Sequence, residues 1–189
     1  MRPEPVPAAA PRPTLAIAIE PLGPGAVSPV VEMLVPLLQD VVDDGASIGF
    51  LPPLGAEEAR QYWESVEGAV QAGGRLLWVA RQPDGRVVGS VQLDLEKRAN
   101  GDHRAELIKL MVHTAARRRG IARDLMRAAE AEAKRLGRTT LFLDTRLGDP
   151  SEILYRGLGW QFAGSIPRYA RSANGALDAN AIYYRLLGD

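Results

Sequence analysis

The feature that most constrains the fold is a strand pattern that leads, through a glycine, into an amphipathic helix and then a second strand. Residues 104–113 alternate at period two, a spacing typical of a half-buried strand. This spacing places on one predicted face Glu106, Ile108, Leu110 and Val112. An apolar helical stripe begins at Gly120 and ends at Gly137, and residues 139–145 form another strand pattern. Two strands joined by one helix form a βαβ crossover, which predicts that they are parallel neighbours.

The rest of the chain surrounds this unit with antiparallel strands and further helices. Strands are predicted over 14–22, 75–82, 86–97, 160–170 and 180–187, and helices over 28–45, 56–74 and 149–159. The predicted order is β-α-α-β-β-β-α-β-α-β-β. We expect a single domain over residues 14–189 of the α/β (α+β) class, with a mixed, mostly antiparallel sheet, a central parallel pair and helices on both faces.

Local capping signals predict where two of the helices begin. Ser28 is a candidate N-cap followed by a proline, and Pro36 predicts a kink or break within the same helix. Asp149 is the candidate N-cap of the last helix, with Pro150 at the first helical position and Glu152 nearly completing a capping box.

Composition excludes several classes of function. The chain of 189 residues has no cysteine and two histidines, so disulfides, thiolate catalysis and zinc–sulfur sites are excluded and no metal site is expected. The 23 basic and 23 acidic side chains cancel, which argues against nucleic acid and membrane surfaces as partners. Residues 1–13 contain five prolines and predict a disordered tail, not a signal peptide. Since no apolar run reaches the ~18 residues of a membrane span, we expect a cytoplasmic protein.

The arginine-rich stretch before the central helix is a candidate anion site. The first N–H groups of a helix have no intrahelical partner, and Gly120 lets the backbone approach a phosphate closely. Arginine side chains can add bidentate contacts. The strings G-x-x-x-x-G-K-[ST] and G-x-G-x-x-G are both missing from the chain. The pattern R-x-x-G-x-A at 117–122 is therefore a weak signal by itself, and a solvated charge run remains an alternative.

Two motifs together resemble the GNAT acyltransferases. Residues 112–122, VHTAARRRGIA, match the family's V-x-P-x-x-[QR]-x-x-G-x-[GA], except that Thr114 stands where proline is frequent. Residues 154–160, LYRGLGW, match a helix tyrosine followed by glycine and an aromatic residue. The resemblance covers residues 14–187 and departs at Gly148, where the family often has an asparagine that contacts the cofactor. The segments GASIGF, LLWVA, RAELIKLMV, LFLDT and AIYYRLL are also similar to the tabtoxin-resistance acetyltransferases, a branch that acetylates an amino-acid-like β-lactam toxin.

The resemblance implies acetyl-CoA as cosubstrate and no metal. It places acetyl-CoA where strands 104–113 and 139–145 splay, with the strand backbone beside the pantetheine arm and the arginine-rich loop around the pyrophosphate. The implied cofactor-binding residues are Leu110, Met111, Val112, Arg117, Arg118, Arg119, Gly120, Ile121, Ala122 and Ser151.

The acceptor amine calls for a general base. Its pKa of about 10.4 means that holding it neutral at pH 7 costs about 4.6 kcal/mol. Glu106 is the first candidate, at a spacing similar to that of the catalytic glutamate of the histone acetyltransferase branch, and Asp144 is the second. By the resemblance, Tyr155 protonates the departing CoA thiolate. The structural alternatives are an ion pair of Glu106 with Arg104, a turn or capping role for Asp144, and a core position for Tyr155.

Four hypotheses about function follow. The first is an acetyl-CoA-dependent N-acetyltransferase that acts on a primary amine of a small molecule, amino-acid-like or an antibiotic or toxin. The second is a peptide or protein N-acetyltransferase, and the third is a non-catalytic acetyl-CoA-binding module. The fourth is a nucleic-acid binder, against which the zero net charge argues. Acceptor specificity is expected in loops 45–55 and 165–180, and a homodimer is a further expectation because dimers are common in families of this type.

Overall fold

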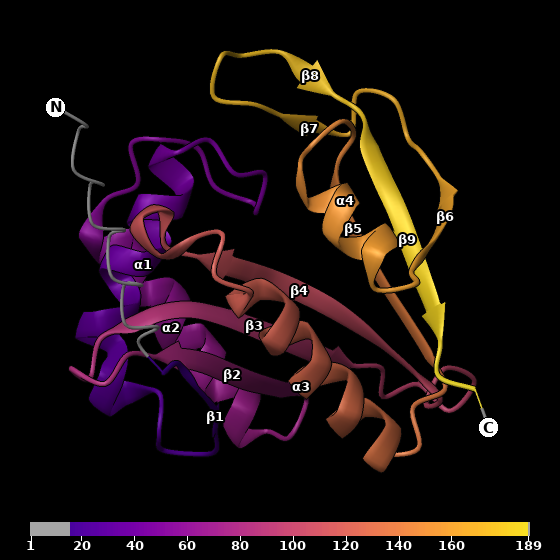
Figure 1. Ribbon diagram of the computed structural model, residues 1–189, viewed down its shortest axis with the longest axis horizontal. Coiled ribbons are helices and arrows are strands. Elements are labelled where there is room, and N and C mark those ends of the chain that lie inside the picture. Colours follow the sequence, from indigo (N-terminus) through magenta and orange to yellow (C-terminus); the bar gives the residue numbers. More distant parts are fainter. Residues whose placement is uncertain (1–15, 189) are drawn as a thin grey trace, which may run out of the picture.

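The computed structural model describes residues 16–188, and its core is a seven-stranded sheet of order β1-β2-β3-β4-β5-β9-β6 (Figure 1). Its strands are β1 (Ala18–Leu22), β2 (Arg75–Arg81), β3 (Val87–Leu95), β4 (Arg104–Val112), β5 (Thr140–Arg146), β6 (Gln161–Gly164) and β9 (Asn180–Leu186). A separate hairpin pairs β7 (Ala170–Arg171) with β8 (Leu177–Asp178). The tail predicted over residues 1–13 lies outside the described residues.

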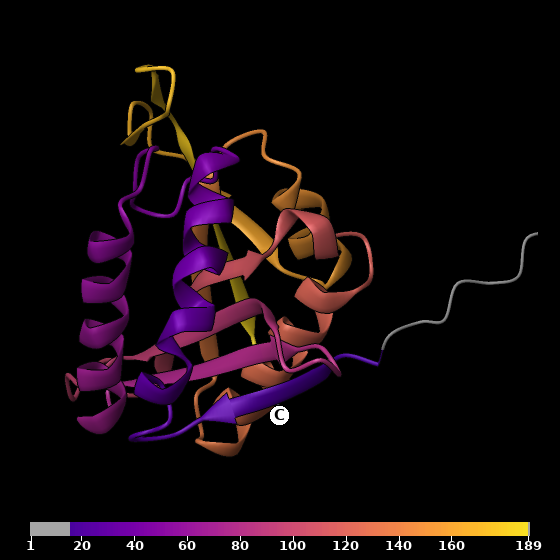
Figure 2. The same ribbon diagram turned by 90° about the vertical axis from the view of Figure 1, so that its left-hand side faces the viewer.

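Helices cover both faces of the sheet, as predicted. They are α1 (Val31–Asp43), α2 (Ala56–Gln71), α3 (Ile121–Arg135) and α4 (Ser151–Gly157), with short 3-10 turns at Ser28–Val30 and Thr114–Ala116. One apolar core joins α1 and α2 to the sheet, and a second joins α3 and α4 to its other face. Figure 2 shows α1 and α2 on one side of the strands and α3 and α4 on the other. The predicted fold class is confirmed.

The central parallel pair is present but short. Strand β4 pairs with β5 in parallel only from Arg104 to Glu106, opposite Thr140 to Phe142. Beyond these residues β4 continues along β3 and β5 continues along β9, both antiparallel. The sheet therefore opens into two diverging halves after Glu106, and the later part of β4 has a free edge on the side of the gap (Figure 1).

A bulge in β4 overturns the prediction that Glu106, Ile108, Leu110 and Val112 share one face. Lys109 has a left-handed φ of 53°, and the β3–β4 register shifts between Ser90, opposite Met111, and Gln92, opposite Ile108. One extra residue in β4 inverts the alternation of side chains. The residues that pack on the α3 side are Ala105 and Leu107 before the bulge and Leu110 and Val112 after it. Glu106 and Ile108 therefore face the α1–α2 side.

In the first helix, the predicted side-chain cap at Ser28 and a break at Pro36 are wrong, although a 3-10 turn does begin at Ser28 and leads into α1. Helix α1 continues through Pro36, which sits early enough that the carbonyl left without a partner is that of Glu32, in the first turn. Ser28 does not cap with its side chain. The Glu67 carboxylate of α2 instead accepts the backbone N–H groups of Gly25, Val27 and Ser28 at 2.7, 2.9 and 3.0 Å. A residue about 40 positions away supplies the cap, so the local sequence carried no signal for it.

The end of the chain also differs from the prediction. The single strand predicted over 160–170 is divided into β6 and β7, since Pro167 between them has no N–H for a ladder. The C-terminal strand β9 lies between β5 and β6, as part of the same sheet. Among residues 16–188, no helix is long and apolar enough to cross a membrane.

Candidate active site

The gap between β4 and β5 opens into a cavity of about 380 Å³ that collects the three predicted catalytic residues. Strand β4 contributes Glu106, β5 contributes Asp144 and α4 contributes Tyr155. The polar lining also includes Lys109, Ser151 and Tyr169. The three predicted catalytic residues, which span 49 positions of the sequence, are brought together because the parallel pair ends at Glu106.

Glu106 is half-buried at the point where the two strands separate. Burial raises the pKa of its carboxyl, and the negative charges of Asp144 and Asp94 raise it further, while Lys109 and Arg75 oppose the shift. Arg104, the alternative ion-pair partner of Glu106, pairs with Glu96 instead, at 3.1 Å. A carboxylate with a raised pKa and no ion-pair partner in its own strand is suited to accept a proton.

Asp144 is exposed to the cavity side of β5. The Asn180 side-chain Nδ2 donates to the Asp144 carboxylate at 3.4 Å, and the Asn180 side-chain Oδ1 accepts the Ile166 N–H at 2.9 Å. One asparagine of β9 thus connects Asp144 to the segment that precedes the β7–β8 hairpin.

Tyr155 is 6% exposed and is both a core residue and a cavity residue. Its ring packs against Trp160 and Tyr183, with ring centroids 6.4 and 5.8 Å away. Burial raises the pKa of its hydroxyl, and a hydrogen bond with Ser151 opposes that rise. The hydroxyl is therefore protonated at neutral pH and available as a donor. Ser151 also lies 2.9 Å from the Thr145 hydroxyl, oxygen to oxygen.

A second cavity, of about 480 Å³, lies between the start of α3 and helix α4. Gly120 is the N-cap of α3, with a left-handed φ of 83°, and no side chain caps the helix. The first N–H groups of α3 therefore have no intrahelical or side-chain acceptor. Arg118 is also left-handed, at φ 64°. Left-handed residues next to a helix start turn successive N–H groups into a concave anion site.

The three arginines before Gly120 point to different surroundings. Arg118 lines the cavity at the start of α3. Arg117 also lines it, but its guanidinium pairs with Asp44 at 2.6 Å and donates to the Val112 carbonyl at 3.2 Å. Arg119 lines a different hollow, against α1, beside His113. The prediction that all three side chains meet cofactor phosphates is therefore not supported for Arg119.

The remaining predicted cofactor residues lie in three different surroundings. Leu110 lines the first cavity and Val112 the second, on the free edge of β4. The Met111 side chain points away, into the core under α1 and α2. Ile121 and Ala122 line the second cavity and Ser151 the first.

Two departures from the family motif have structural roles. The Thr114 backbone N–H and hydroxyl both donate to the Asp40 carboxylate at 2.7 Å, which fixes the start of the loop to α1. Gly148 is left-handed, at φ 88°, and its N–H donates to Glu152 at 2.6 Å. Asp149 is not a side-chain N-cap as predicted, because its carboxylate pairs with Arg146 at 2.9 Å.

Two cationic residues of the site were missed by the sequence analysis. The Lys109 amine donates to the Ile48 carbonyl and lies 5.7 Å and 5.9 Å from the ring centroids of Phe50 and Tyr62. Burial lowers the pKa of this amine. Its position depends on the bulge, for which the regular alternation of β4 gave no signal.

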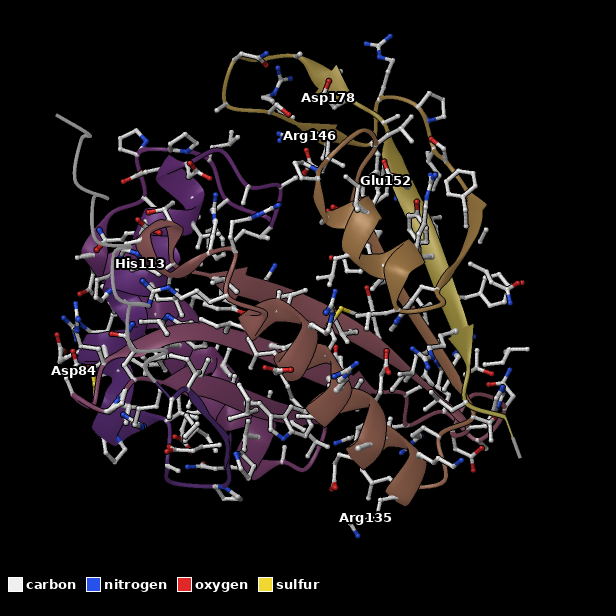
Figure 3. All side chains as sticks on the ribbon, in the orientation of Figure 1. Asp84, His113, Arg135, Arg146, Glu152 and Asp178 are labelled. Carbon is white, nitrogen blue, oxygen red and sulfur yellow. The ribbon has the colours of Figure 1, made fainter. Side chains whose placement is uncertain are left out.

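Arg146 is the second missed residue, at the end of β5 (Figure 3). Besides its ion pair with Asp149, its guanidinium donates to the Gly45 carbonyl and the Ser172 hydroxyl, both at 3.2 Å. It lines a third cavity, of about 550 Å³, between segments 45–52 and 170–173. Residues shared with the first cavity are Ala46, Ser47, Gly49 and Ala170, so the two spaces adjoin. Within residues 16–188, no group of three or more histidine, aspartate or glutamate side chains is arranged to hold a metal.

Comparisons with known proteins agree with this geometry. Residues 43–160 match the model of the acetyltransferase (GNAT) family. An uncharacterized N-acetyltransferase from the hisH-hisA intergenic region of Azospirillum brasilense is 37% identical over 109 residues, or 57% of this chain. The match spans 62% of that relative, less than two thirds of its length.

Solved structures share the fold over nearly the whole chain. An N-acetyltransferase from Staphylococcus aureus Mu50 gives a TM-score of 0.75 at 18% identity, over 92% of this chain and 99% of that one. A protein from Salmonella typhimurium, described as an acetyltransferase and solved with its cofactor acetyl-CoA, gives 0.73 at 17% identity, over 92% and 95%.

Proposed function

The chain belongs to the acetyltransferase (GNAT) family, and from this premise we propose that it transfers the acetyl group of acetyl-CoA to a primary amine of a small molecule. The acceptor class that we propose is amino-acid-like, which includes antibiotics and toxins of that kind. The observation that carries the proposal is the convergence of Glu106, Asp144 and Tyr155 on one cavity at the end of the β4–β5 gap.

The residues around the gap fit acetyl-CoA, which supplies an activated acetyl thioester when bound. The edge of β4 that β5 leaves free after Glu106 offers backbone groups along Leu110–Val112 for an extended pantetheine arm, which would replace the hydrogen bond from Arg117 to the Val112 carbonyl. The uncapped N–H groups at the start of α3 suit a pyrophosphate, with Arg118 beside them. Ser151 lines the same cavity as Tyr155 and is its hydrogen-bond partner, where the acetyl group would arrive.

The acceptor amine would attack directly. Glu106 takes a proton from the amine nitrogen, either directly or through a water held between Glu106 and Asp144. The bond from nitrogen to the acetyl carbon forms, and the bond from that carbon to sulfur breaks. Tyr155 donates its O–H to the departing sulfur, and its raised pKa keeps the hydroxyl protonated until then. The two carboxylates also favour a cationic acceptor before it is deprotonated.

The first experiment is a melting-temperature measurement with saturating acetyl-CoA. Ligand at 100 times its Kd adds about 2.7 kcal/mol of stability, which for a domain of this size raises the Tm by roughly 5–11 °C. Release of CoA is then measured with free amines and with peptides. Turnover of free amines supports the proposal, and turnover of peptides alone would replace it with a peptide N-acetyltransferase. A Tm shift without turnover of either would indicate a binding module.

A further inference from the structure

Lys109 occupies a position in the acceptor cavity that the proposed chemistry does not use. It follows Glu106 by three residues and stands at the β4 bulge, and its amine reaches the loop that carries Ile48. A Cβ added at Gly49 would lie 3.2 Å from this amine, so the loop closes tightly around it. Phe50 and Tyr62 place their rings beside the same amine.

The amine is held in place by a backbone carbonyl, and within residues 16–188 it has no carboxylate at ion-pair distance. Glu106 and Asp144 act on it only at longer range, where their charges oppose the lowering of its pKa by burial. Of the acidic side chains that line the same cavity, Asp149 is paired with Arg146 at 2.9 Å. Glu106 and Asp144 are the carboxylates left to meet an acceptor ammonium.

A partly buried cation without an anionic partner is costly, and a ligand anion beside it recovers the lost interaction. The cavity thus offers carboxylates for an ammonium group and, separately, one ammonium for an anion. A ligand that carries both charges on one small molecule satisfies both sets. The adjoining space of about 550 Å³ leaves room for the rest of such a molecule.

We infer that Lys109 binds a carboxylate of the acceptor, so that the enzyme selects amines that carry an acid group in the same molecule, as amino acids do. Lys109 is then a specificity-determining residue, distinct from the groups that move protons. The inference rests on the proposed N-acetyltransferase function.

The test compares amino acids with their own carboxamides, which differ at the acid group and keep the same amine and side chain. CoA release is measured for all twenty pairs, with the wild-type chain, Lys109→Met and Lys109→Arg. Methionine preserves the unbranched stem that packs near Phe50 and Tyr62, while arginine preserves the charge. The matched control is Lys134→Met, because Lys134 is an exposed lysine near the end of α3.

We expect the wild type to prefer the acid of the accepted pair by about 10- to 100-fold in kcat/KM, the size of a charge-assisted hydrogen bond. The carboxamide has the less basic amine, which by itself would favour the amide. Lys109→Met should bring the acid-to-amide ratio close to one while amide turnover persists, Lys109→Arg should restore part of the preference, and Lys134→Met should leave it unchanged.

The outcomes separate the inference from the function on which it rests. Wild-type turnover with no preference for the acid, or a preference that survives in Lys109→Met, would overturn the role of Lys109 alone. Absence of turnover with every amine, despite a Tm shift with acetyl-CoA, would overturn the small-molecule function and the inference with it. If Lys109→Met does not fold, Lys109→Gln and Lys109→Arg provide the same comparison of charge.

Discussion

The two sides of the β4–β5 gap are built in different ways. The loop at residues 113–120 is one continuous segment, whose backbone turns on local hydrogen bonds, such as Ala116 N–H to His113 carbonyl at 2.8 Å, and on the left-handed Gly120, while Asp40 and Asp44 fix it at Thr114 and Arg117. The acceptor side is assembled from distant segments. Lys109 meets Ile48 across 61 positions, and Arg146 meets Gly45 across 101. The first side offers backbone groups in a fixed shape, and the second offers side chains whose positions depend on long-range contacts.

This difference predicts that substitutions on the acceptor side change chemistry and selectivity, while substitutions on the loop side change cofactor affinity. Figure 3 labels one residue of each side, His113 at the start of the loop and Arg146 near the β7–β8 hairpin. Four measurements test the contrast, in order of expected effect.

The largest effect is expected for Glu106→Gln, which keeps the shape and removes the base. We expect kcat to fall by about 10²- to 10⁴-fold with little change in the acetyl-CoA-induced Tm shift. Glu132→Gln is the control, since Glu132 is a half-buried glutamate of α3 that pairs with Arg135 and lines none of the three cavities, and it should leave kcat unchanged. Full activity in Glu106→Gln and also in Asp144→Asn would remove both carboxylates from the mechanism.

Gly120→Glu tests the loop side. A Cβ at Gly120 meets nothing closer than Asp124 at 4.0 Å, so the substitution adds backbone strain and a negative charge where phosphates are expected, without a clash. Like charges about 4 Å apart repel by roughly 1–4 kcal/mol, so we expect a roughly 100-fold loss of acetyl-CoA affinity by calorimetry.

The matched control for that experiment is Gly137→Glu. Gly137 is also left-handed, at φ 72°, has open space around it and follows the other end of α3. Both variants should lose similar stability from strain, about 1–2 kcal/mol, but Gly137→Glu should keep wild-type affinity. Equal affinity losses in the two variants would mean that strain in α3, not an anion site at Gly120, sets cofactor binding.

Arg146→Gln tests whether the acceptor side depends on long-range contacts. The change breaks hydrogen bonds to the Gly45 carbonyl and Ser172 that hold two loops around the outer cavity. Each such bond contributes about 1 kcal/mol, so we expect the KM for the acceptor to rise about 5- to 10-fold while the KM for acetyl-CoA stays constant. Arg135→Gln, whose partner Glu132 lies in its own helix, should change neither. A parallel rise in both KM values would mean that Arg146 supports the stability of the whole fold and not the acceptor side in particular.

The smallest effect is a shift in pH dependence. Burial is the main cause that raises the pKa of Glu106, and the negative charge of Asp144 is the second. Activity is lost as the pH falls through that pKa, because the base becomes protonated. Asp144→Asn lowers the Glu106 pKa, so the acidic limb of the kcat/KM profile should move to lower pH. A limb that stays in place, or moves to higher pH, would show that Glu106 is not the group that titrates in it.

Short-range patterns explain what the sequence analysis predicted well. The strand, glycine and helix over residues 104–137 predicted the parallel pair and the start of α3, because alternation, a left-handed glycine and an apolar stripe all act within a few residues. The loop motif also led to the family, which the match over residues 43–160 supports. Tyr155 came from the resemblance, while Glu106 and Asp144 were chosen chiefly by their places on the two strands beside the gap, and the structure places all three in one cavity.

The errors share a different cause. Ser28 was predicted to cap the first helix, but Glu67, 39 positions away, accepts the N–H groups there. Asp149 was predicted to cap the last helix, but its carboxylate pairs with Arg146 instead. Arg119 was grouped with its neighbours because they are adjacent in the chain, yet its side chain lines another hollow. In each case a contact or backbone turn that the residue pattern does not show decided where a side chain points, whether the partner was 39 positions away, as Glu67 is, or three, as Arg146 is.

By itself, the sequence determined the secondary structure around the gap, the crossover that creates it and the glycine at the start of α3, since these depend on backbone preferences of neighbouring residues. The tertiary structure alone decided the acceptor side. The extra residue at Lys109 forms a bulge where β4 pairs with β3, and this pairing exists only in the folded sheet. The bulge leaves Glu106 facing α1 and α2 while Leu110 and Val112 face α3. A one-residue change in register exchanges the two faces of a strand, and which register forms depends on what packs against it.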